Sequence, residues 1–231
     1  MSLEKWIQPQ HLTADAVAAL RRKFDQRPIP CVWIDDFMNT ERLTSIRNVA
    51  LHDGVMETLY KLYDRNEWVS KETFYAAPEE QRFIFETTCR GFRPGHEMSP
   101  SVLSHLRLMA DLARPAFHAW LSAVTGEPVD DVASVILNAL GRHHFLRWHN
   151  DAHPQRTVCA VLYLHQGWQP NYGGRLLMEL PDGSVEAIEP HFNRLVLFFP
   201  QHSTRHAVEP MTEAAGSWLR LNYTAWFRSL R

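Results

Sequence analysis

Two side chains that commonly bind metal ions stand two positions apart in the C-terminal half of the sequence, His149 and Asp151. In an extended segment, residues i and i+2 project to the same side of the backbone. The imidazole and the carboxylate would therefore face one point in space, as two ligands of one ion do. The motif alone is weak, because many polar loops contain a histidine and an aspartate at this spacing.

A second histidine from a distant strand would complete a 2-His-1-carboxylate set. Such a set fills one face of an octahedron and is used by non-haem iron(II) oxygenases. The downstream candidates are His165, His191, His202 and His206. We favour His206, which stands at the edge of a short strand that leads into the last one. His202 is the nearest rival, and its alternative interpretation is a solvated turn residue.

The last predicted strand, around residues 219–227, carries an arginine on one of its faces. Strand alternation assigns Trp218, Arg220, Asn222, Thr224 and Trp226 to one face, and Leu219, Leu221, Tyr223, Ala225 and Phe227 to the other. The second face is typical of packing. A buried guanidinium needs an anionic partner, because an unpaired buried charge costs several kcal/mol. That partner is either a structural Asp or Glu, or the carboxylate of a ligand held by both prongs of the guanidinium.

The elements that must position these residues change in character near residue 128. Before that point the periodicity is mostly helical. Helices are predicted from Leu12 to Leu20 and from Thr40 to Leu51, and a third begins at Ser99-Pro100, a cap followed by a first-turn proline. A fourth follows Pro115 and stops at Gly126, and residues 32–34 are predicted as a strand.

Residues 129–231 are strand-like. Apolar and β-branched runs at 157–165, 195–199 and 219–227, with a hairpin around Pro181-Asp182-Gly183, predict short antiparallel strands. Short strands joined by turns favour a sandwich or barrel over βαβ units. We expect one domain over residues 1–231, with a mostly helical part at 1–128 and a β core at 129–231.

Composition sets limits on partners and compartment. Hydrophobic residues make up 45% and charged residues 22% of the 231-residue chain, which predicts a sizeable packed core. The net charge is -2 without a marked Lys/Arg run, so we expect no nucleic-acid partner. The longest apolar run near the C-terminus is far too short for a bilayer, so we expect no membrane partner. Three scattered cysteines predict a reducing, cytoplasmic setting.

The order and spacing of these residues resemble the prolyl-4-hydroxylase-like branch of the iron(II)- and 2-oxoglutarate-dependent dioxygenases. The ordered matches are His149-x-Asp151, Arg156 at the start of a strand ending Tyr163-Leu164, Gly173-Gly174-Arg175-Leu176, Pro190-His191-Phe192-Asn193-Arg194-Leu195, His206-Ala207-Val208, and Arg220 six residues before Trp226. The resemblance covers roughly residues 135–228 and is specific as an ordered set.

This resemblance implies a mainly β fold with α-helices, in which N-terminal helices buttress a double-stranded β-helix (jelly-roll) core. It implies Fe(II) held by His149, Asp151 and His206. It also implies 2-oxoglutarate as cosubstrate, with its C5 carboxylate on Arg220 and the Tyr163 hydroxyl. O2 is the other cosubstrate, and ascorbate is a candidate reductant. The implied reaction is hydroxylation of an unactivated C–H bond on a prolyl residue of a protein, as in ribosomal-protein and hypoxia-sensing prolyl hydroxylases.

The sequence departs from the family pattern in two places. The family carries a tyrosine roughly ten residues before His-x-Asp. Here Ala139 and Leu140 stand in that region, with Asn138 and His143 nearby, so no residue is assigned to the C1 end of 2-oxoglutarate. The stretch between His206 and Arg220 is longer than usual, and residues 212–216 are predicted to form an inserted turn. Asn222 is a further candidate for contact with the cosubstrate.

Two other classes of function are compatible with the sequence. One is a hydroxylase of a free amino acid or another small molecule on the same fold. The other is a jelly-roll binding module without catalysis, which retention of the three ligands and Arg220 argues against. The sequence does not indicate an oligomeric state.

Overall fold

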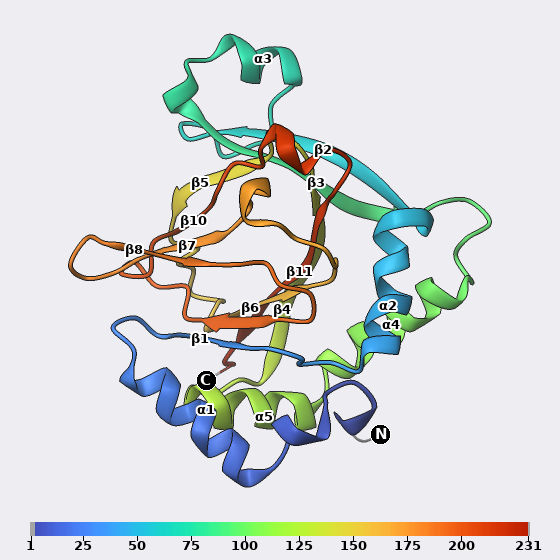
Figure 1. Cartoon of the computed structure of the whole chain (residues 1–231), viewed down its shortest axis with the longest axis vertical. Coiled ribbons are helices and arrows are strands. Elements are labelled where there is room, and N and C mark those ends of the chain that lie inside the picture. Colours follow the sequence, from blue (N-terminus) through green and yellow to red (C-terminus); the bar gives the residue numbers. More distant parts are fainter. Residues whose placement is uncertain (1–2, 231) are drawn as a thin grey trace.

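The fold, seen in a computed structural model that describes residues 3–230, is built on one curled antiparallel sheet (Figure 1). The strands are β1 (Cys31–Ile34), β2 (Gly54–Leu62), β3 (Arg82–Phe92), β4 (Asp131–Leu140), β5 (Phe145–His149), β6 (Val158–Tyr163), β7 (Leu176–Glu179), β8 (Val185–Ile188), β9 (Leu195–Phe198), β10 (His206–Val208) and β11 (Arg220–Arg228). Their order across the sheet is β1-β9-β6-β11-β4-β3-β5-β10-β7-β8, with β2 paired to β3. The sheet curls around an interior cavity. β5 and β10 lie on one side of this cavity, and they face β11 and β4 on the other side.

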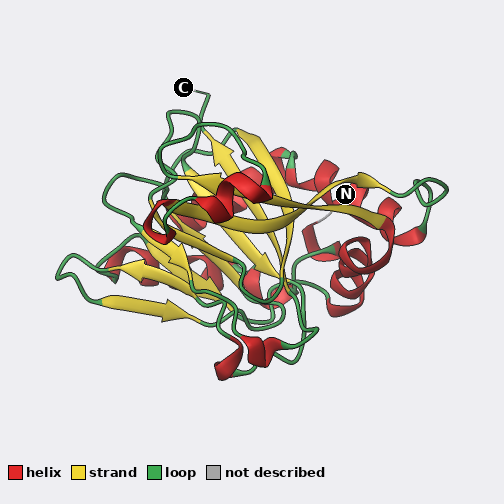
Figure 2. Cartoon of the chain, turned by 90° about the horizontal axis from the view of Figure 1, so that it is seen from above, coloured by secondary structure: helices red, strands yellow, loops and turns green. Residues whose placement is uncertain are grey.

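Five α-helices lie around this sheet: α1 (Ala14–Gln26), α2 (Thr40–Asn48), α3 (Lys71–Ala76), α4 (Pro100–Leu112) and α5 (Pro115–Thr125). Figure 2 shows the strands running through the molecule with helices along its outside. The Phe24 ring of α1 packs on Phe199, 4.8 Å between centroids, and Phe117 of α5 packs on Phe227 of β11 at 5.6 Å. The predicted jelly-roll core with buttressing helices is therefore confirmed.

The helix boundaries follow from local chemistry. The Ser99 hydroxyl accepts a hydrogen bond from the Val102 amide, and Pro100 occupies the first turn of α4. Gly126 ends α5 with a positive φ of 76°, a conformation that glycine adopts at low cost. Both ends lie where the sequence predicts them. Within residues 3–230, no helix is both long enough and apolar enough to cross a bilayer.

The β2–β3 hairpin was not predicted. Residues 1–128 were expected to be mostly helical, but they supply three strands, and β3 lies inside the sheet between β4 and β5. The burial along β3 does not alternate cleanly, because one of its faces carries Glu86 and Thr88 into the interior. A strand whose buried face is polar lacks the apolar alternation by which strands are recognised.

The two faces of β11 are as predicted. Leu221, Tyr223, Ala225 and Phe227 belong to the main hydrophobic core, which lies between the sheet and α5. The opposite face, from Arg220 to Trp226, borders a cavity inside the curl. Trp218 precedes the strand and stacks on His165, 5.4 Å between ring centroids.

Candidate active site

The interior of the curled sheet holds a cavity of about 310 Å³. His149, Asp151 and His206 border it, and so do Arg220 and Asn222 of β11. The candidate ligands and the candidate anchor for a carboxylate therefore share one enclosed space. Tyr163 is not at the cavity wall but lies behind Arg220, 1% exposed.

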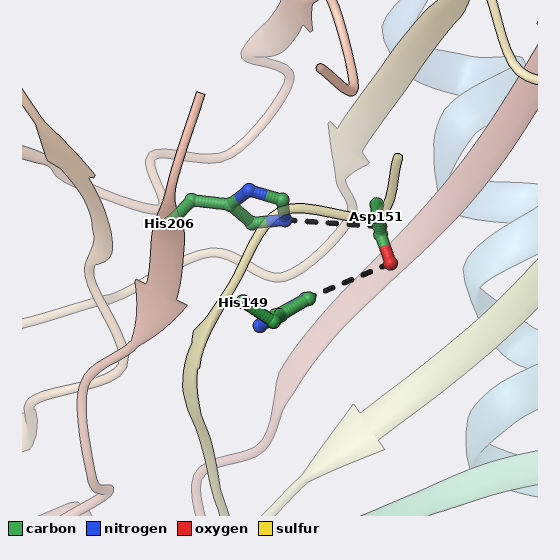
Figure 3. A group of neighbouring side chains, drawn as sticks. All are labelled: His149, Asp151 and His206. Atoms are coloured by element: carbon green, nitrogen blue, oxygen red, sulfur yellow. Dashed lines mark ion pairs between the residues drawn. The ribbon is translucent and has the colours of Figure 1, made fainter. Parts of the chain in front are cut away.

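The two histidines and the aspartate converge on one point (Figure 3). The distances are 3.8 Å from His149 Nε2 to Asp151 Oδ1 and 3.7 Å from His206 Nε2 to Asp151 Oδ2, and one potential ligand atom from each residue lies within 4.8 Å of the others. His149 ends β5 and His206 begins β10, and the two residues are direct cross-strand partners. Strand pairing therefore fixes the spacing of the two rings.

Backbone carbonyls orient both imidazoles. The Nδ1 atom of His149 lies 2.7 Å from the Arg147 carbonyl oxygen, and that of His206 lies 3.2 Å from the Thr204 carbonyl oxygen. A carbonyl oxygen can only accept, so each Nδ1 carries the proton and donates. Each Nε2 then has a lone pair directed at the shared point, the usual tautomer of a metal-binding histidine.

Asp151 reaches this point by a route that differs from the expected one. The expectation was an extended segment through His149 and Asp151, but the strand ends at His149 and Asp151 has a φ of 53°. Aspartate tolerates this left-handed conformation better than most residues. The Asn150 side chain supports the turn by accepting from the Ala152 amide at 3.1 Å. A sharp turn therefore brings the carboxylate beside the imidazole.

The Asp151 carboxylate is held from two sides. Arg156 donates to its Oδ1 at 3.1 Å and Trp226 Nε1 donates to its Oδ2 at 3.2 Å, while the Arg156 guanidinium lies 4.5 Å from the Trp226 ring centroid. Burial raises the pKa of Asp151, but His206, His149 and Arg156 lower it by more, so the pKa lies well below its usual range. Burial, then the nearby His206 ring, lowers the pKa of His149 to about 4. At neutral pH Asp151 is thus a carboxylate and His149 is a neutral imidazole. Both residues are in the form that binds a metal ion.

The other candidate histidines lie elsewhere. His202 is an exposed turn residue, 3.5 Å from the Asn150 amide nitrogen. His165 contacts the Leu219 carbonyl at 2.7 Å, and His191 contacts Glu189 at 2.9 Å. His149, Asp151 and His206 form the group of three potential ligands found among residues 3–230.

Arg220 is a buried cation at the far side of the cavity, 3% exposed. Its Nε donates to the Gly174 carbonyl at 2.7 Å, and its Nη2 donates to the Tyr163 hydroxyl at 3.1 Å. Its Nη1 donates to Asn222 Oδ1 at 2.5 Å. These partners are neutral, and within residues 3–230 the guanidinium pairs with neither Asp nor Glu. No carboxylate of the described residues is therefore within ion-pair distance of the guanidinium, although its charge acts on Glu86 of the same cavity, and Arg220 remains a candidate to bind an anionic ligand.

Gly174 explains how the arginine fits. It has a φ of 75°, and a Cβ built there would lie 2.4 Å from Met211 Sδ and 3.1 Å from Arg220 Cδ. The glycine therefore serves both the turn and the close approach of the arginine stem. The predicted inserted turn is also present, with Glu213–Ala215 as one turn of 3₁₀ helix.

The donor set suits iron(II) and 2-oxoglutarate. Two imidazole nitrogens and one carboxylate on a single side of a point match the facial arrangement of non-haem iron(II) oxygenases. Arg220, a buried guanidinium without a carboxylate among the described residues, suits the far end of a dicarboxylate. Both features come from residues of this chain.

Several residues of the cavity wall were missed from the sequence. Glu86 lies on β3, and Lys61, Trp68 and Phe83 belong to the hairpin that was not predicted. Burial, with the Asp151 charge adding to it and Arg90 and Arg220 opposing it, raises the pKa of Glu86 to about 7. Without the strand assignment, no sequence signal placed these residues at the cavity.

Comparisons with known proteins agree with this geometry. Residues 135–228 match the sequence profile of the 2OG-Fe(II) oxygenase superfamily. A relative, prolyl 3-hydroxylase OGFOD1 of Mus musculus, is 28% identical over 132 residues, which are 53% of this chain and 23% of that protein. The chain thus spans about a quarter of the length of that relative.

Similar solved structures extend the likeness to the whole fold. A Pseudomonas putida prolyl-4-hydroxylase has a TM-score of 0.62 at 21% identity, over 92% of this chain and 99% of that one. A prolyl hydroxylase from Trichoplax adhaerens, in complex with a hypoxia inducible factor peptide fragment, has a TM-score of 0.60 at 18% identity, over 94% and 93%. Residues 135–228 of this chain thus resemble the 2OG-Fe(II) oxygenase superfamily, and the chain has the fold of the prolyl 4-hydroxylases.

Proposed function

We propose that this enzyme hydroxylates a prolyl residue of a protein, with Fe(II), 2-oxoglutarate and O2. The observation that carries the proposal is the presence of the His149–Asp151–His206 group and the buried Arg220 in one cavity. A metal site alone would fit many reactions. A metal site facing an unneutralised arginine fits a reaction in which an anionic cosubstrate spans the distance between them.

Each residue of the site has a stated role in this proposal. His149, Asp151 and His206 hold the iron, and their carbonyl, arginine and tryptophan partners keep them oriented. Bound iron would supply the oxidising chemistry, by which one oxygen atom of O2 enters succinate as 2-oxoglutarate loses CO2 and the other enters the C–H bond as a hydroxyl group. Arg220, supported by Tyr163, binds the C5 carboxylate of the cosubstrate.

The cavity wall supplies orientation and excludes water. Apolar side chains of the sheet, among them Ile136, Leu146 and Val161, border the space between the ligands and Arg220. Lys61, Trp68 and Phe83 of the β2–β3 hairpin border the same cavity, and the Trp68 side chain is 44% exposed. The hairpin can therefore contact both a bound substrate and solvent.

The choice of a prolyl substrate draws support from the similar proteins, which are named as a prolyl 3-hydroxylase and two prolyl hydroxylases of known structure. The setting is proposed to be cytoplasmic, where Cys31, Cys89 and Cys159, all free in the structure, stay reduced. Ascorbate is proposed as the reductant that keeps iron in its divalent state.

The direct test is succinate formation from 2-oxoglutarate, with Fe(II) and ascorbate, in the presence of proline-containing peptides or of metabolite pools. We expect iron- and O2-dependent succinate and a +16 Da peptide product, both lost in His206→Ala. Turnover of free amino acids but of no peptide would retain the enzyme class and overturn the prolyl-protein substrate. If the wild-type protein neither bound 2-oxoglutarate nor formed succinate, a binding module would replace the enzyme.

A further inference from the structure

Asn138 is a polar side chain at the cavity that makes no hydrogen bond among residues 3–230. It lies on β4, is 8% exposed and borders the same cavity as Arg220. Its Oδ1 is enclosed and has no hydrogen-bond partner among residues 3–230. The Nδ2 atom is not enclosed and makes no hydrogen bond within that range either, so the amide end of the side chain borders the cavity.

Strand pairing places Asn138 beside the arginine. Asn138 pairs with Asn222 on β11, two residues from Arg220, and Asn222 pairs in turn with Tyr163 on β6. On its other side Asn138 pairs with Thr88 on β3. Directly paired residues of an antiparallel sheet project from the same face. The four side chains therefore form one polar row across four strands, on the sheet face that holds Arg220, and Asn138 and Asn222 are the two of them that border the cavity.

The two asparagines of this row differ in their hydrogen bonding. Asn222 accepts a hydrogen bond from Arg220 Nη1 at 2.5 Å and donates one to Thr224 Oγ1 at 2.9 Å. The oxygen of its carboxamide is therefore already bound to the arginine. The Asn138 carboxamide makes no hydrogen bond to a side chain or backbone group of the described residues. A buried polar group without a partner destabilises the folded protein, and native structures retain few of them. A carboxylate ligand cannot satisfy the enclosed Oδ1, which only accepts, but the Nδ2 that borders the cavity has two N–H groups free to donate to such a ligand.

We propose that Asn138 is a cosubstrate-binding residue, whose amide N–H groups donate to a carboxylate oxygen of 2-oxoglutarate. The inference rests on the proposed function and adds a donor from β4 to those of Arg220 and Tyr163. A carboxamide has two N–H donors and no charge, so it adds direction without a further cation. This role also explains why an asparagine lies on a sheet wall where a leucine would destabilise the ligand-free protein less.

The proposal predicts two opposite effects of one substitution. Asn138→Leu removes the donor and the unpartnered oxygen while keeping a similar volume. The melting temperature of the ligand-free protein should rise or stay unchanged, because an unsatisfied polar group is replaced by an apolar one. Affinity for 2-oxoglutarate should fall roughly tenfold or more, as expected when a hydrogen bond to a charged group is lost. A merely structural asparagine would give a lower melting temperature with unchanged affinity.

The experiment is calorimetric titration of 2-oxoglutarate into protein loaded with Mn(II), which binds the cosubstrate without turnover. Thr88→Val is the matched control, since the Thr88 hydroxyl is also buried without a partner among residues 3–230 but does not border the cavity. It should leave the affinity unchanged. Arg220→Ala is the positive control and should bind weakly.

The outcomes separate this inference from the function on which it rests. Absence of binding by the wild-type protein would overturn both. Tight wild-type binding with equal affinity in Asn138→Leu would overturn the role of Asn138 alone. If the leucine variant fails to fold, Asn138→Ala answers the same question, and wild-type affinity in that variant is the contradicting result.

Discussion

At the residue scale, the proposed metal site depends on two imidazoles fixed by backbone carbonyls. His206 is 4% exposed and its ring centroid lies 4.3 Å from that of His149. We expect His206→Ala to abolish high-affinity binding of Mn(II) or Fe(II), because two ligands no longer define a face of an octahedron. Calorimetry with Mn(II) measures this directly. His202→Ala is the control, since that residue lies in an exposed turn, and a loss of binding there would refute the assignment.

The arginine anchor gives a graded prediction. Arg220→Lys should weaken 2-oxoglutarate binding, because an ammonium cannot reproduce the planar fork that contacts Gly174, Asn222 and Tyr163. Tyr163→Phe removes one neutral hydroxyl and should cost less, about 0.5–1.5 kcal/mol. Titration of the cosubstrate into both variants checks the order. A larger loss for Tyr163→Phe than for Arg220→Lys would contradict it.

Glu86 makes stability depend on pH. Its pKa is raised from 4.5 to about 7 in the folded protein. Below pH 4.5 both folded and unfolded chains hold the proton. Between these values the unfolded chain releases its proton first, so the free energy of unfolding falls as pH rises, and the loss is complete above pH 7. At about 1.4 kcal/mol per pKa unit, the loss is about 3–4 kcal/mol.

Glu86→Gln, which stays neutral, should therefore be more stable than the wild-type protein at pH 8 and equal to it at pH 4. Urea unfolding of the metal-free protein at both pH values measures the difference. Glu67→Gln, a change at an exposed glutamate of the same hairpin, is the control. If the stability of wild type and of Glu86→Gln responded equally to pH, groups other than Arg90 and Arg220 would have to stabilise the Glu86 carboxylate.

At the element scale, the β2–β3 hairpin and α3 form an aromatic layer. Phe74 of α3 is 1% exposed and packs against Tyr60 of β2 and Phe85 of β3, with centroid distances of 5.1 and 6.1 Å. We expect Phe74→Ala to lower the free energy of unfolding by about 3 kcal/mol, through lost burial and the cavity it leaves. Tyr75→Ala next to it should cost far less, because Tyr75 is 46% exposed. Urea unfolding of both variants tests this contrast.

The β2–β3 hairpin is also an example of a feature that could not be predicted from the sequence. The spacing of His149 and Asp151, the position of Arg220 and the alternation of β11 were predictable, because each leaves a local pattern in the sequence. The caps of α4 and α5 were predictable for the same reason. Glu86 and Asn138 were not identified as cavity residues, because their position depends on strands that meet through long-range pairing. The turn at Asp151 was also missed, since spacing does not encode a left-handed φ.

At the scale of the whole molecule, the N-terminal and C-terminal parts are joined in one sheet. β1 pairs with β9, and β3 lies between β4 and β5. The Asn193 side chain accepts from the Met38 amide and donates to the Met38 carbonyl, both at 2.8 Å. The N-terminal part is therefore joined to the β core by strand pairing and by side-chain hydrogen bonds.

This predicts that residues 129–231 do not fold alone. The fragment would lack β3 and β1, which leaves β4, β5 and β9 with unpaired edges and exposes the core that α5 covers. Circular dichroism during urea titration should show no cooperative transition for the fragment and a single one for the whole chain. A cooperative fragment would establish the β core as an independent domain.

The place of β11 in the sheet also governs how the protein assembles during synthesis. β11 occupies residues 220–228, yet it lies between β4 and β6. A ribosome that has made every residue up to 219 has therefore released two strands whose facing edges have nothing between them. Such edges pair readily with other chains. The nascent chain consequently carries two open strand edges until residues 220–228 have left the ribosome, when β11 closes the sheet and brings Arg220 into the cavity.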